Sequence, residues 1–336
     1  MNRKNIIISP SGKLYGSEYV LLDFLRGSTN SYDVYVPKHS VFYNKLKEEG
    51  FNVYGFTNLK KLYFSIFFKM LISSKNLYLN EGGHISYVKL LAKILPKRKF
   101  VVVLRLLEDC NDKLHRLTDN IRLVAVSNFI KKNIISNNNS IVVYDPYQLK
   151  HKKKSIINKN KNTILKIGVV GRIIETKGIG VLPKIINDLP IEDRSKIKLN
   201  FFGSFDENSN WFIVFKNELS EIEGLNFSFV GFIKNQDEIY QKCDLILHLN
   251  KFEALGRIIF EAIDYNIPFL CFKEGGSGEL AYKLDLTSQI ASDENDMTLK
   301  LKNYIFSQIF DEKFYNKAKN LIKENFKHTK YANKLE

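Results

Sequence analysis

The chain has 336 residues, 44% of them hydrophobic and 26% charged, which excludes a disordered chain and leaves room for two ordinary domains. Lys and Arg outnumber Asp and Glu by 51 to 36, so the formal net charge is +15 and an anionic partner is expected. No apolar run is long enough to span a membrane, since the nearest candidate, residues 62–73, is broken by Lys69.

Strands and helices alternate in the first half of the chain, which is typical of a parallel sheet. Residues 5–9 are predicted to form a strand that leads through a loop into a helix at 17–25. Further buried strands are predicted at 99–106 and at 123–127. Ser127, at the end of the latter, is expected to cap the helix that follows.

Residues 60–71 (KKLYFSIFFKML) are basic near both ends and unusually aromatic. Helices that lie on a membrane surface have this composition. A helix packed on a sheet can have it too, because the first domain needs apolar helices to cover its sheet. The sequence leaves both interpretations open, since it does not show which face of the helix is exposed.

A run of Lys and Asn over 150–162 has too little apolar content to enter a core. We therefore predict an N-terminal domain at 1–150, a linker at 151–162 and a C-terminal domain at 163–336. The elements predicted for the second domain are, in order, a strand at 164–170, a helix at 179–187, strands at 197–202 and 227–230, a helix at 237–242, a strand at 244–249 and a helix at 258–265. The expected fold class is α/β, with two Rossmann-like parallel-sheet domains.

Residues 252–262 (FEALGRIIFEA) form the most informative segment and lie between a predicted strand and a predicted helix. In open α/β sheets such a loop lies at the carboxyl end of the strand, where ligands bind, and the first N–H groups of the helix favour a phosphate. Glu253 lies in this loop, and Glu261 lies eight positions later on the helix. Carboxylates accept hydrogen bonds from hydroxyl groups, and a phosphate flanked by hydroxyl-rich rings is a nucleotide sugar.

A second segment, 167–178 (IGVVGRIIETKG), has the same order of strand, turn and helix start. Arg172 has a planar guanidinium that suits two phosphate oxygens, and Lys177 adds a mobile positive charge. Taken singly, a Glu at a helix start or a surface Lys is more often a cap or a solvated charge. The co-occurrence of these residues, in this order and on these elements, favours a site for a diphosphate donor.

The spacing of the two glutamates, followed by 267–270 (IPFL) and by the Gly-Gly turn at 275–279 (GGSGE), resembles the signature of retaining GT-B glycosyltransferases of glycosyltransferase family 4. The resemblance covers the second half of the chain well and the first half in outline. It implies a GT-B fold, in which two Rossmann-like domains face a cleft. By this resemblance the domain at 1–150 would bind the acceptor, and the domain at 163–336 would bind the nucleotide sugar.

The resemblance also implies roles for individual residues. Arg172 and Lys177 would bind the donor's diphosphate, Glu261 the ribose hydroxyls and Glu253 a hydroxyl of the donor sugar. Glu253, Arg172 and Lys177 are accordingly the candidate catalytic residues. The remaining candidate donor contacts are Gly16, Gly256, Arg257 and Ile258.

The resemblance is partial in the first domain. Residues 14–18 (LYGSE) are similar to the family's glycine loop, which usually has paired glycines, but only Gly16 stands at that place. Many family members have a histidine after the strand that corresponds to 100–104, where this chain has Arg105. Arg105 and His84 are therefore candidate contacts to the transferred sugar or to the acceptor.

No D-x-D sequence occurs, so the metal-bridged diphosphate site of the other large glycosyltransferase architecture has no evident ligands. We expect neither a metal nor a cofactor, and a nucleotide-diphosphate sugar as the donor substrate. Cys110, Cys243 and Cys271 have no paired spacing, which indicates a reducing compartment. We expect a cytoplasmic protein, either free or attached peripherally to the anionic inner face of the cytoplasmic membrane.

The expected activity is a retaining, metal-independent, hexosyltransferase-type transfer to a glycan acceptor. The family and the basic aromatic segment together suggest a lipid-linked acceptor in surface polysaccharide synthesis, such as that of O-antigen, capsule or lipopolysaccharide. Two alternatives stay open: a nucleotide-sugar epimerase or hydrolase on the same fold, and a non-catalytic carbohydrate-binding assembly protein. Nucleic acid is not expected as a partner, because no nucleic-acid-binding motif accompanies the charge.

Overall fold

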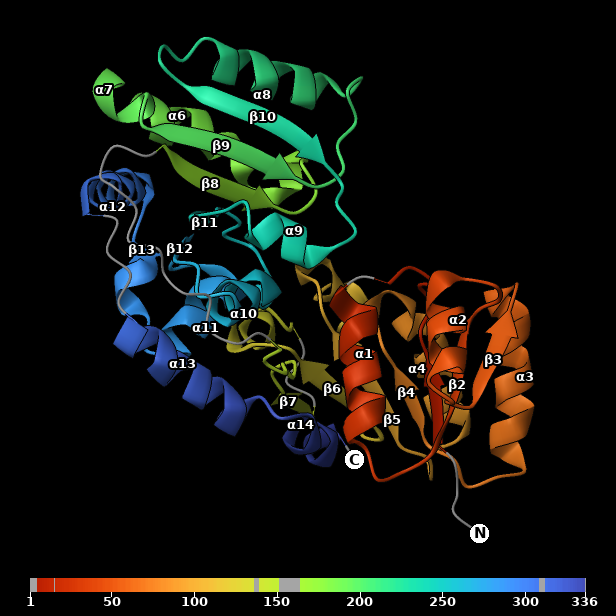
Figure 1. The fold of residues 1–336 in the computed structure, drawn as a ribbon. Coiled ribbons are helices and arrows are strands. Elements are labelled where there is room, and N and C mark those ends of the chain that lie inside the picture. The colour runs from red at the N-terminus through yellow and green to blue at the C-terminus, as the bar shows by residue number, and fades with distance from the viewer. Residues whose placement is uncertain (1–4, 15, 136–138, 151–163, 308–311, 336) are drawn as a thin grey trace. The chain divides into compact units, whose positions relative to one another are not determined.

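The computed structural model describes residues 5–14, 16–135, 139–150, 164–307 and 312–335 (Figure 1). The chain divides into two compact units, the first made of Met1–Gln148 and Glu324–Glu336, the second of Leu149–Lys323. The predicted linker at 151–162 lies outside the described residues. The sequence-based division kept the chain's end with the second domain, whereas Glu324–Glu336 groups with the first unit.

The first unit is built on a seven-stranded sheet in the order β3-β2-β1-β4-β5-β6-β7, in which all neighbours are parallel. The chain order reverses between β1 and β4, which makes their carboxyl ends a topological switch point. Ile6, Ile7 and Ile8 of β1 are all buried, as a strand covered on both faces requires. The strands are β1 (Asn5–Ile8), β2 (Tyr32–Pro37), β3 (Val53–Phe56), β4 (Leu77–Leu79), β5 (Phe100–Leu104), β6 (Ile121–Ala125) and β7 (Ser140–Val142).

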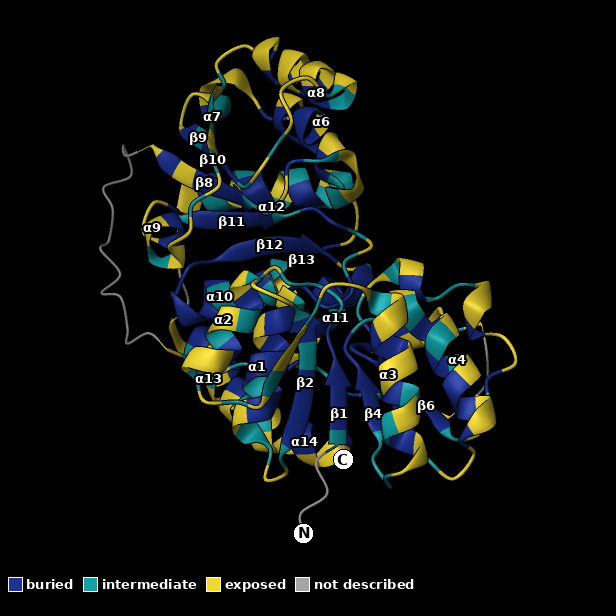
Figure 2. Ribbon diagram, turned by 90° about the vertical axis from the view of Figure 1, so that its right-hand side faces the viewer, coloured by how far each residue is buried: buried dark blue, intermediate teal, exposed yellow. Residues whose placement is uncertain are grey.

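Helices cover both faces of this sheet. α1 (Gly16–Gly27) and α2 (Val41–Glu48) lie on one side, and α3 (Leu59–Leu71) and α4 (Ile85–Ile94) on the other (Figure 2). This placement follows from right-handed crossovers, because the chain moves outward through β1, β2 and β3 and then back through β4 and β5. The short α5 (Asn128–Lys132) begins at Ser127, whose hydroxyl accepts the N–H of Ile130 over 3.1 Å, so the predicted cap is confirmed.

The last helix of the chain, α14 (His328–Leu335), packs beside α1. The rings of Phe24 and Tyr331 meet edge to face with centroids 6.0 Å apart. The backbone N–H of Tyr147 donates to the carbonyl of Phe326 over 2.9 Å. These contacts tie the end of the chain to the first unit.

The second unit has a six-stranded parallel sheet in the order β10-β9-β8-β11-β12-β13. Its switch point lies between β8 and β11. Its strands are β8 (Leu165–Val170), β9 (Ile197–Phe202), β10 (Asn226–Gly231), β11 (Leu245–His248), β12 (Phe269–Phe272) and β13 (Ile290–Ala291). Its helices are α6 (Leu182–Asn187), α7 (Ile191–Arg194), α8 (Asn210–Ser220), α9 (Gln236–Tyr240), α10 (Arg257–Asp264), α11 (Gly275–Lys283), α12 (Glu294–Ser307) and α13 (Glu312–Asn325), which ends just past this unit.

The predicted α/β class, with two parallel sheets, is confirmed. Each strand and helix named for the second half is present, and the helix predicted at 179–187 begins with a 3-10 turn, Ile179–Val181. One local prediction is wrong: the stretch 275–279, expected as a Gly-Gly turn, forms the first turn of α11. Glycine is a poor helix former, but the first turn of this helix is buried, so packing overrides propensity there.

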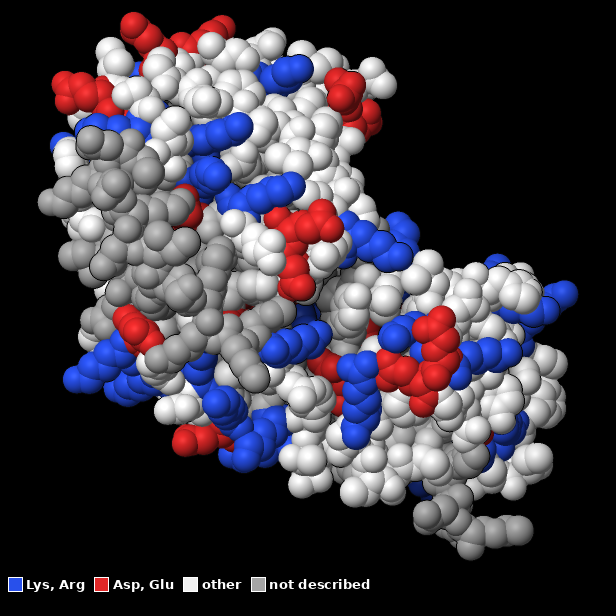
Figure 3. Space-filling view, in the orientation of Figure 1, with Lys and Arg blue, Asp and Glu red and all other residues white. Residues whose placement is uncertain are grey.

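Basic side chains dominate the charged surface. Figure 3 shows Lys and Arg spread over the visible face of both units, with Asp and Glu gathered in smaller groups. Cys243 and Cys271 are buried, and Cys110 is partly buried. None of the helices within the described ranges is both long and apolar enough to cross a bilayer.

Candidate active site

The residues of the two sequence motifs meet at one edge of the second sheet. β8 and β11 are neighbours in that sheet, and the chain order reverses between them. Arg172 and Lys177 follow β8, and Glu253 follows β11. Because parallel strands end at the same edge, the fold brings these side chains to the place where such sheets bind ligands.

Lys177 and Glu253 form a direct ion pair, in which Nζ donates to Oε2 over 2.9 Å. Asn250 Nδ2 donates to the same oxygen over 3.0 Å. Burial raises the pKa of Glu253, but the charge of Lys177, the ring of His248 and the two hydrogen bonds outweigh it, so the pKa is lowered. The Glu253 carboxylate is therefore ionised at neutral pH. The sequence motifs did not predict that these two residues touch each other.

His248, the last residue of β11, is a polar neighbour of this pair that sequence reasoning treated only as part of a strand. Its Nε2 is buried and has no hydrogen-bond partner in the part of the chain that the structure describes. Burial lowers the pKa of His248 to about 4, with Glu253 raising it and Lys177 lowering it by their charges. The ring is therefore neutral at pH 7. A histidine interrupting an apolar strand is the signal that could have singled it out.

Arg172 is exposed and forms no hydrogen bond or ion pair with any residue that the structure describes. Its backbone is held firmly, since the N–H of Gly171 donates to the carbonyl of Phe202 over 2.9 Å. Gly203 has φ +153°, and a Cβ there would lie 1.8 Å from the carbonyl oxygen of Gly171, so only glycine allows the two strand ends to approach. A fixed backbone with a free guanidinium suits a ligand contact.

Gly256 precedes α10 in the left-handed conformation, with φ 80° and ψ 61°. A Cβ there would lie 2.1 Å from Ser277 Oγ, so glycine permits the starts of α10 and α11 to meet. Arg257 and Ile258 open α10, where the leading N–H groups have no carbonyl one turn back to bind. Ser277 Oγ is buried and lacks a hydrogen-bond partner among the described residues. Donor groups thus gather at these two helix starts.

Glu261, on α10, is turned toward α9. The hydroxyl of Tyr240 donates to its Oε2, and Gln236 Nε2 donates to its Oε1 over 3.4 Å. Burial raises the pKa of Glu261, although these hydrogen bonds and the charge of Arg257 oppose the rise. Tyr240 and Gln236 carry no motif of their own, and only the fold reveals them as partners of this carboxylate.

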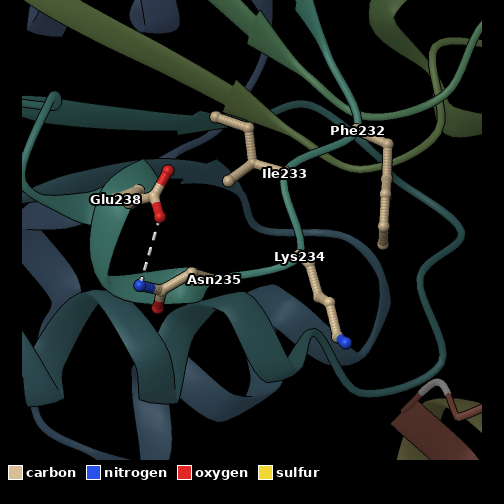
Figure 4. Close-up of a pocket in the computed structure, with 5 residues that line it drawn as sticks. All are labelled: Phe232, Ile233, Lys234, Asn235 and Glu238. Atoms are coloured by element: carbon tan, nitrogen blue, oxygen red, sulfur yellow. Dashed lines mark hydrogen bonds between the residues drawn. The ribbon is translucent and has the colours of Figure 1, made fainter.

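The segment between β10 and α9 borders an open hollow of about 680 Å³ (Figure 4). Within it, Asn235 Nδ2 donates to Glu238 Oε1 over 3.3 Å. The ring of Phe232 is 70% exposed. An exposed ring beside a hollow suits a flat, aromatic ligand group. The lining residues are Phe232, Ile233, Lys234, Asn235 and Glu238.

Arg105, which follows β5 in the first unit, points into the interior. Its Nη1 donates to Asp145 Oδ1 over 2.6 Å, its Nη2 to the hydroxyl of Tyr331 over 3.2 Å, and its Nε to the carbonyl of Asn80 over 3.3 Å. Burial lowers the pKa of Arg105, but Asp145 and Tyr331 outweigh it, so the pKa is raised. These contacts favour a structural role. The sugar or acceptor contact of Arg105 stays a prediction.

Gly16 and His84 lie near the switch point of the first sheet, after β1 and β4. Gly16 opens α1 and is exposed, and His84 ends the 3-10 turn Gly82–His84. Burial, together with the charge of Lys113, lowers the pKa of His84. Between β4 and His84 lies Glu81, whose pKa is raised by burial and by the charge of Glu18. This edge offers carboxyl groups and a neutral imidazole, which suit hydroxyl-bearing ligands.

No group of three or more His, Cys, Asp or Glu side chains within the described ranges is arranged to hold a metal ion.

Solved structures of low sequence identity share the whole fold. Anabaena HepE in complex with UDP aligns with a TM-score of 0.78 at 17% identity over 98% of both chains. HepE with UDP-glucose aligns with a TM-score of 0.78 at 17% identity, over 99% of this chain and 98% of that one. The lipopolysaccharide outer core galactosyltransferase WaaB, in its apo form, aligns with a TM-score of 0.75 at 15% identity over 99% and 98%. At this identity the likeness establishes the fold, which is GT-B.

A search by sequence among curated proteins gives no match. The family model described as "Glycosyl transferases group 1" matches residues 148–327, which is more than half of the chain and contains both motifs. The protein therefore belongs to the glycosyl transferases group 1 family and is a glycosyltransferase of GT-B fold.

Proposed function

We propose that the protein is a retaining, metal-independent glycosyltransferase of the family 4 type, which transfers a hexose from a nucleoside diphosphate donor to a glycan acceptor. The observation that carries this proposal is the placement of Arg172 and of the Lys177–Glu253 ion pair at the carboxyl ends of the neighbouring strands β8 and β11. Membership of the glycosyl transferases group 1 family supports the reaction class.

In the proposed reaction the bond between the anomeric carbon and the diphosphate oxygen breaks, and negative charge builds on that oxygen. Arg172, Lys177 and the leading N–H groups of α10 stabilise this charge, and preorganised donors of this kind each contribute about 3 kcal/mol. The acceptor hydroxyl attacks the anomeric carbon from the face that the diphosphate leaves, and its proton passes to the departing diphosphate. The configuration is retained without a covalent enzyme intermediate.

In this proposal the two carboxylate oxygens of Glu253 have different partners. Oε2 already accepts hydrogen bonds from Lys177 and Asn250. Oε1 accepts none from the residues that the structure describes. We assign Oε1 to a hydroxyl of the donor sugar, while Oε2 holds the Lys177 ammonium in line with the diphosphate.

The nucleoside is assigned to the neighbouring α9 and α10. Glu261 would accept the ribose hydroxyls, because a carboxylate has lone pairs left after the bonds from Tyr240 and Gln236. The base would lie in the hollow beside Phe232. Uridine diphosphate sugars are the first donors to test, since HepE, which shares the fold, was solved with UDP and with UDP-glucose.

The acceptor is assigned to the first unit, whose switch point carries Glu81 and His84. A lipid-linked glycan in surface polysaccharide synthesis is the acceptor class that we propose. The fold shared with WaaB, a lipopolysaccharide outer core galactosyltransferase, supports this class.

The test combines donor binding with product analysis. Thermal unfolding of the native chain is followed with UDP, GDP, dTDP and ADP sugars, because a ligand at a hundredfold its dissociation constant adds roughly 2.7 kcal/mol of stability. We expect one nucleotide class to raise the melting temperature, and Arg172→Ala to abolish the rise. Lys216→Ala, at an exposed lysine on α8 of the same unit, is the matched control and should respond like the native chain.

The donor that binds is then incubated with and without glycan acceptors. Sugar transfer with the anomeric configuration retained supports the proposal. Release or epimerisation of the sugar without any acceptor would replace it with a hydrolase or epimerase. Tight binding without turnover toward any acceptor class would replace it with a non-catalytic binding protein.

A further inference from the structure

Helix α3 buries one face on the first sheet and exposes a large apolar stripe on the other. The buried side chains are Leu62, Tyr63, Ile66 and Met70. The exposed ones are Phe64 at 67%, Phe68 at 49%, Leu71 at 46% and, at the end of the helix, Ile72 at 90%. These positions recur every three or four residues, so they lie along one side of the helix. An exposed stripe of this size marks an interaction surface.

Helix α4 extends this stripe into a patch. α3 and α4 lie on the same side of the sheet (Figure 2) and touch through Tyr63 and Tyr87, whose stacked rings have centroids 4.3 Å apart. α4 exposes Leu90 at 60% and Ile94 at 49%. The α3–α4 patch is thus made of Phe64, Phe68, Leu71, Ile72, Leu90 and Ile94.

The charges on α3 and α4 themselves have a single sign. Neither helix contains an Asp or a Glu, and between residues 57 and 104 the only acidic residue is Glu81. Two of the lysines there, Lys69 and Lys75, are held by Asp33. The ammonium groups of five others are exposed and have no hydrogen-bond or ion-pair partner within the described chain: Lys60, Lys61, Lys93, Lys97 and Lys99.

Exposed apolar side chains on two helices whose only charged residues are lysines narrow the choice of occupant. A second copy of the chain would bring a patch with the same lysines against this one. Each chain also has a formal net charge of +15, so the two copies would repel each other. An anionic bilayer satisfies both features, because the rings and aliphatic groups enter the boundary between headgroups and acyl chains while the ammonium groups meet lipid phosphates. We infer that the α3–α4 patch docks the first unit onto an anionic phospholipid surface.

The distribution of the patch sets the orientation of the helices. The exposed apolar residues run along the length of α3, from Phe64 to Ile72, rather than gathering at one end. Both helices therefore lie parallel to the lipid surface. The inference rests on the first unit alone, so it is independent of the donor site assigned to the second.

The first experiment is co-sedimentation of the native chain with vesicles of phosphatidylcholine alone or of phosphatidylcholine mixed with phosphatidylglycerol. We expect binding to the anionic vesicles that weakens as salt is raised, and little binding to the neutral ones. Phe64→Gln with Phe68→Gln should weaken binding tenfold or more, since each ring loses its transfer from water. Each of Lys60→Gln and Lys61→Gln should weaken it by about fivefold.

Matched controls come from α8 in the second unit, which exposes Val214 and Lys216 but also carries Glu218. Val214→Gln and Lys216→Gln should bind vesicles like the native chain. A second measurement places a reporter in the patch: Phe64→Trp adds a tryptophan to a chain whose only tryptophan is Trp211. The added emission should shift to the blue with anionic vesicles and stay unshifted with neutral ones.

Equal binding to both kinds of vesicle, or no binding and no blue shift, would overturn the inference. Self-association in analytical ultracentrifugation that is lost in the Phe64→Gln, Phe68→Gln variant, without vesicle binding by the native chain, would replace the membrane with a second copy. Stabilisation by nucleotide sugars is measured on the same variants. It should be unchanged, so failure of lipid binding and failure of the donor site give different results.

Discussion

The two sheets share a topology, yet the arginine that follows a strand is buried and paired in the first unit and exposed in the second. In the first unit Arg105 follows a strand and is buried against Asp145, with exposures of 9% and 7% for the two side chains. In the second unit Arg172 follows a strand and is exposed, without a partner among the described residues. An arginine after a strand is thus a stronger candidate for a ligand contact where the fold leaves its guanidinium without a protein partner.

The largest effect is expected when the buried arginine is removed. Arg105→Ala leaves the Asp145 carboxylate buried without its counter-ion, and loss of one partner of such a pair costs about 3–5 kcal/mol. The measurement is urea unfolding of the first unit followed by circular dichroism. Arg105→Met combined with Asp145→Leu removes both charges and should recover most of the loss. A loss below 1 kcal/mol for Arg105→Ala would show that the pair is not structural.

Arg172→Ala should reduce activity and leave stability nearly unchanged, in contrast to Arg105→Ala. Its stability should stay within about 0.5 kcal/mol of the native chain, because the side chain removed is exposed and has no partner among the described residues. Its kcat/KM should fall by about 10²–10³, or roughly 3–4 kcal/mol, if the guanidinium stabilises the departing diphosphate. Steady-state kinetics with the donor found by thermal shift provide the measurement. An unchanged kcat/KM would remove Arg172 from the reaction.

The partly buried histidine of the second unit, His248, should make stability depend on pH. The pKa of His248 is about 4 in the folded chain, against an ordinary value of 6.5. Between these values the unfolded chain binds a proton that the folded chain does not, so stability is lost as the pH falls from 6.5 toward 4. We expect a loss of about 2 kcal/mol, which is less than the full shift implies because the ring is not completely shielded from water.

The measurement is the free energy of unfolding of the native chain and of His248→Gln, compared from pH 7 to pH 4. The variant should lose about 2 kcal/mol less than the native chain over this range. His115→Gln, at a half-exposed histidine of the first unit, is the control and should follow the native curve. Parallel curves for the native chain and His248→Gln would mean that the ring titrates normally.

The sequence predicted the fold and the donor motifs because both depend on local order. Apolar runs alternate with amphipathic stretches, and the strand ends that bear Arg172 and Glu253 follow from that alternation. The contact between Lys177 and Glu253 is not a local property. It arises because β8 and β11, far apart in the chain, are neighbours in the sheet. For the same reason the sequence did not predict that Arg105 points into the interior, since its partner Asp145 lies forty positions away in the chain.

One error was local instead. The stretch 275–279 was expected as a turn through the family resemblance, but it opens α11, where close packing of Gly276 and Gly278 against neighbouring backbone requires residues without a Cβ. For 60–71 the sequence offered two readings, core helix or interfacial helix. The structure buries one face of α3, with Ile66, as a core helix requires, and exposes the other, with Phe64, while the membrane contact stays a proposal.

The smallest expected effect distinguishes two serines at the starts of helices that follow strands, Ser127 as the N-cap of α5 and Ser277 in the first turn of α11. The hydroxyl of Ser127 in the first unit accepts a hydrogen bond from the N–H of Ile130, so Ser127→Ala should lower the free energy of unfolding by about 1 kcal/mol. Ser277 of the second unit is buried with a hydroxyl that has no partner among the described residues. Ser277→Ala removes that unsatisfied group, so it should leave stability unchanged or raise it by about 1 kcal/mol. Chemical unfolding of both variants gives the comparison. A clear loss of unfolding free energy in Ser277→Ala would mean that its hydroxyl is hydrogen-bonded in solution. Polar groups at the carboxyl edge of the second sheet would then be hydrogen-bonded within the protein, like those of the first.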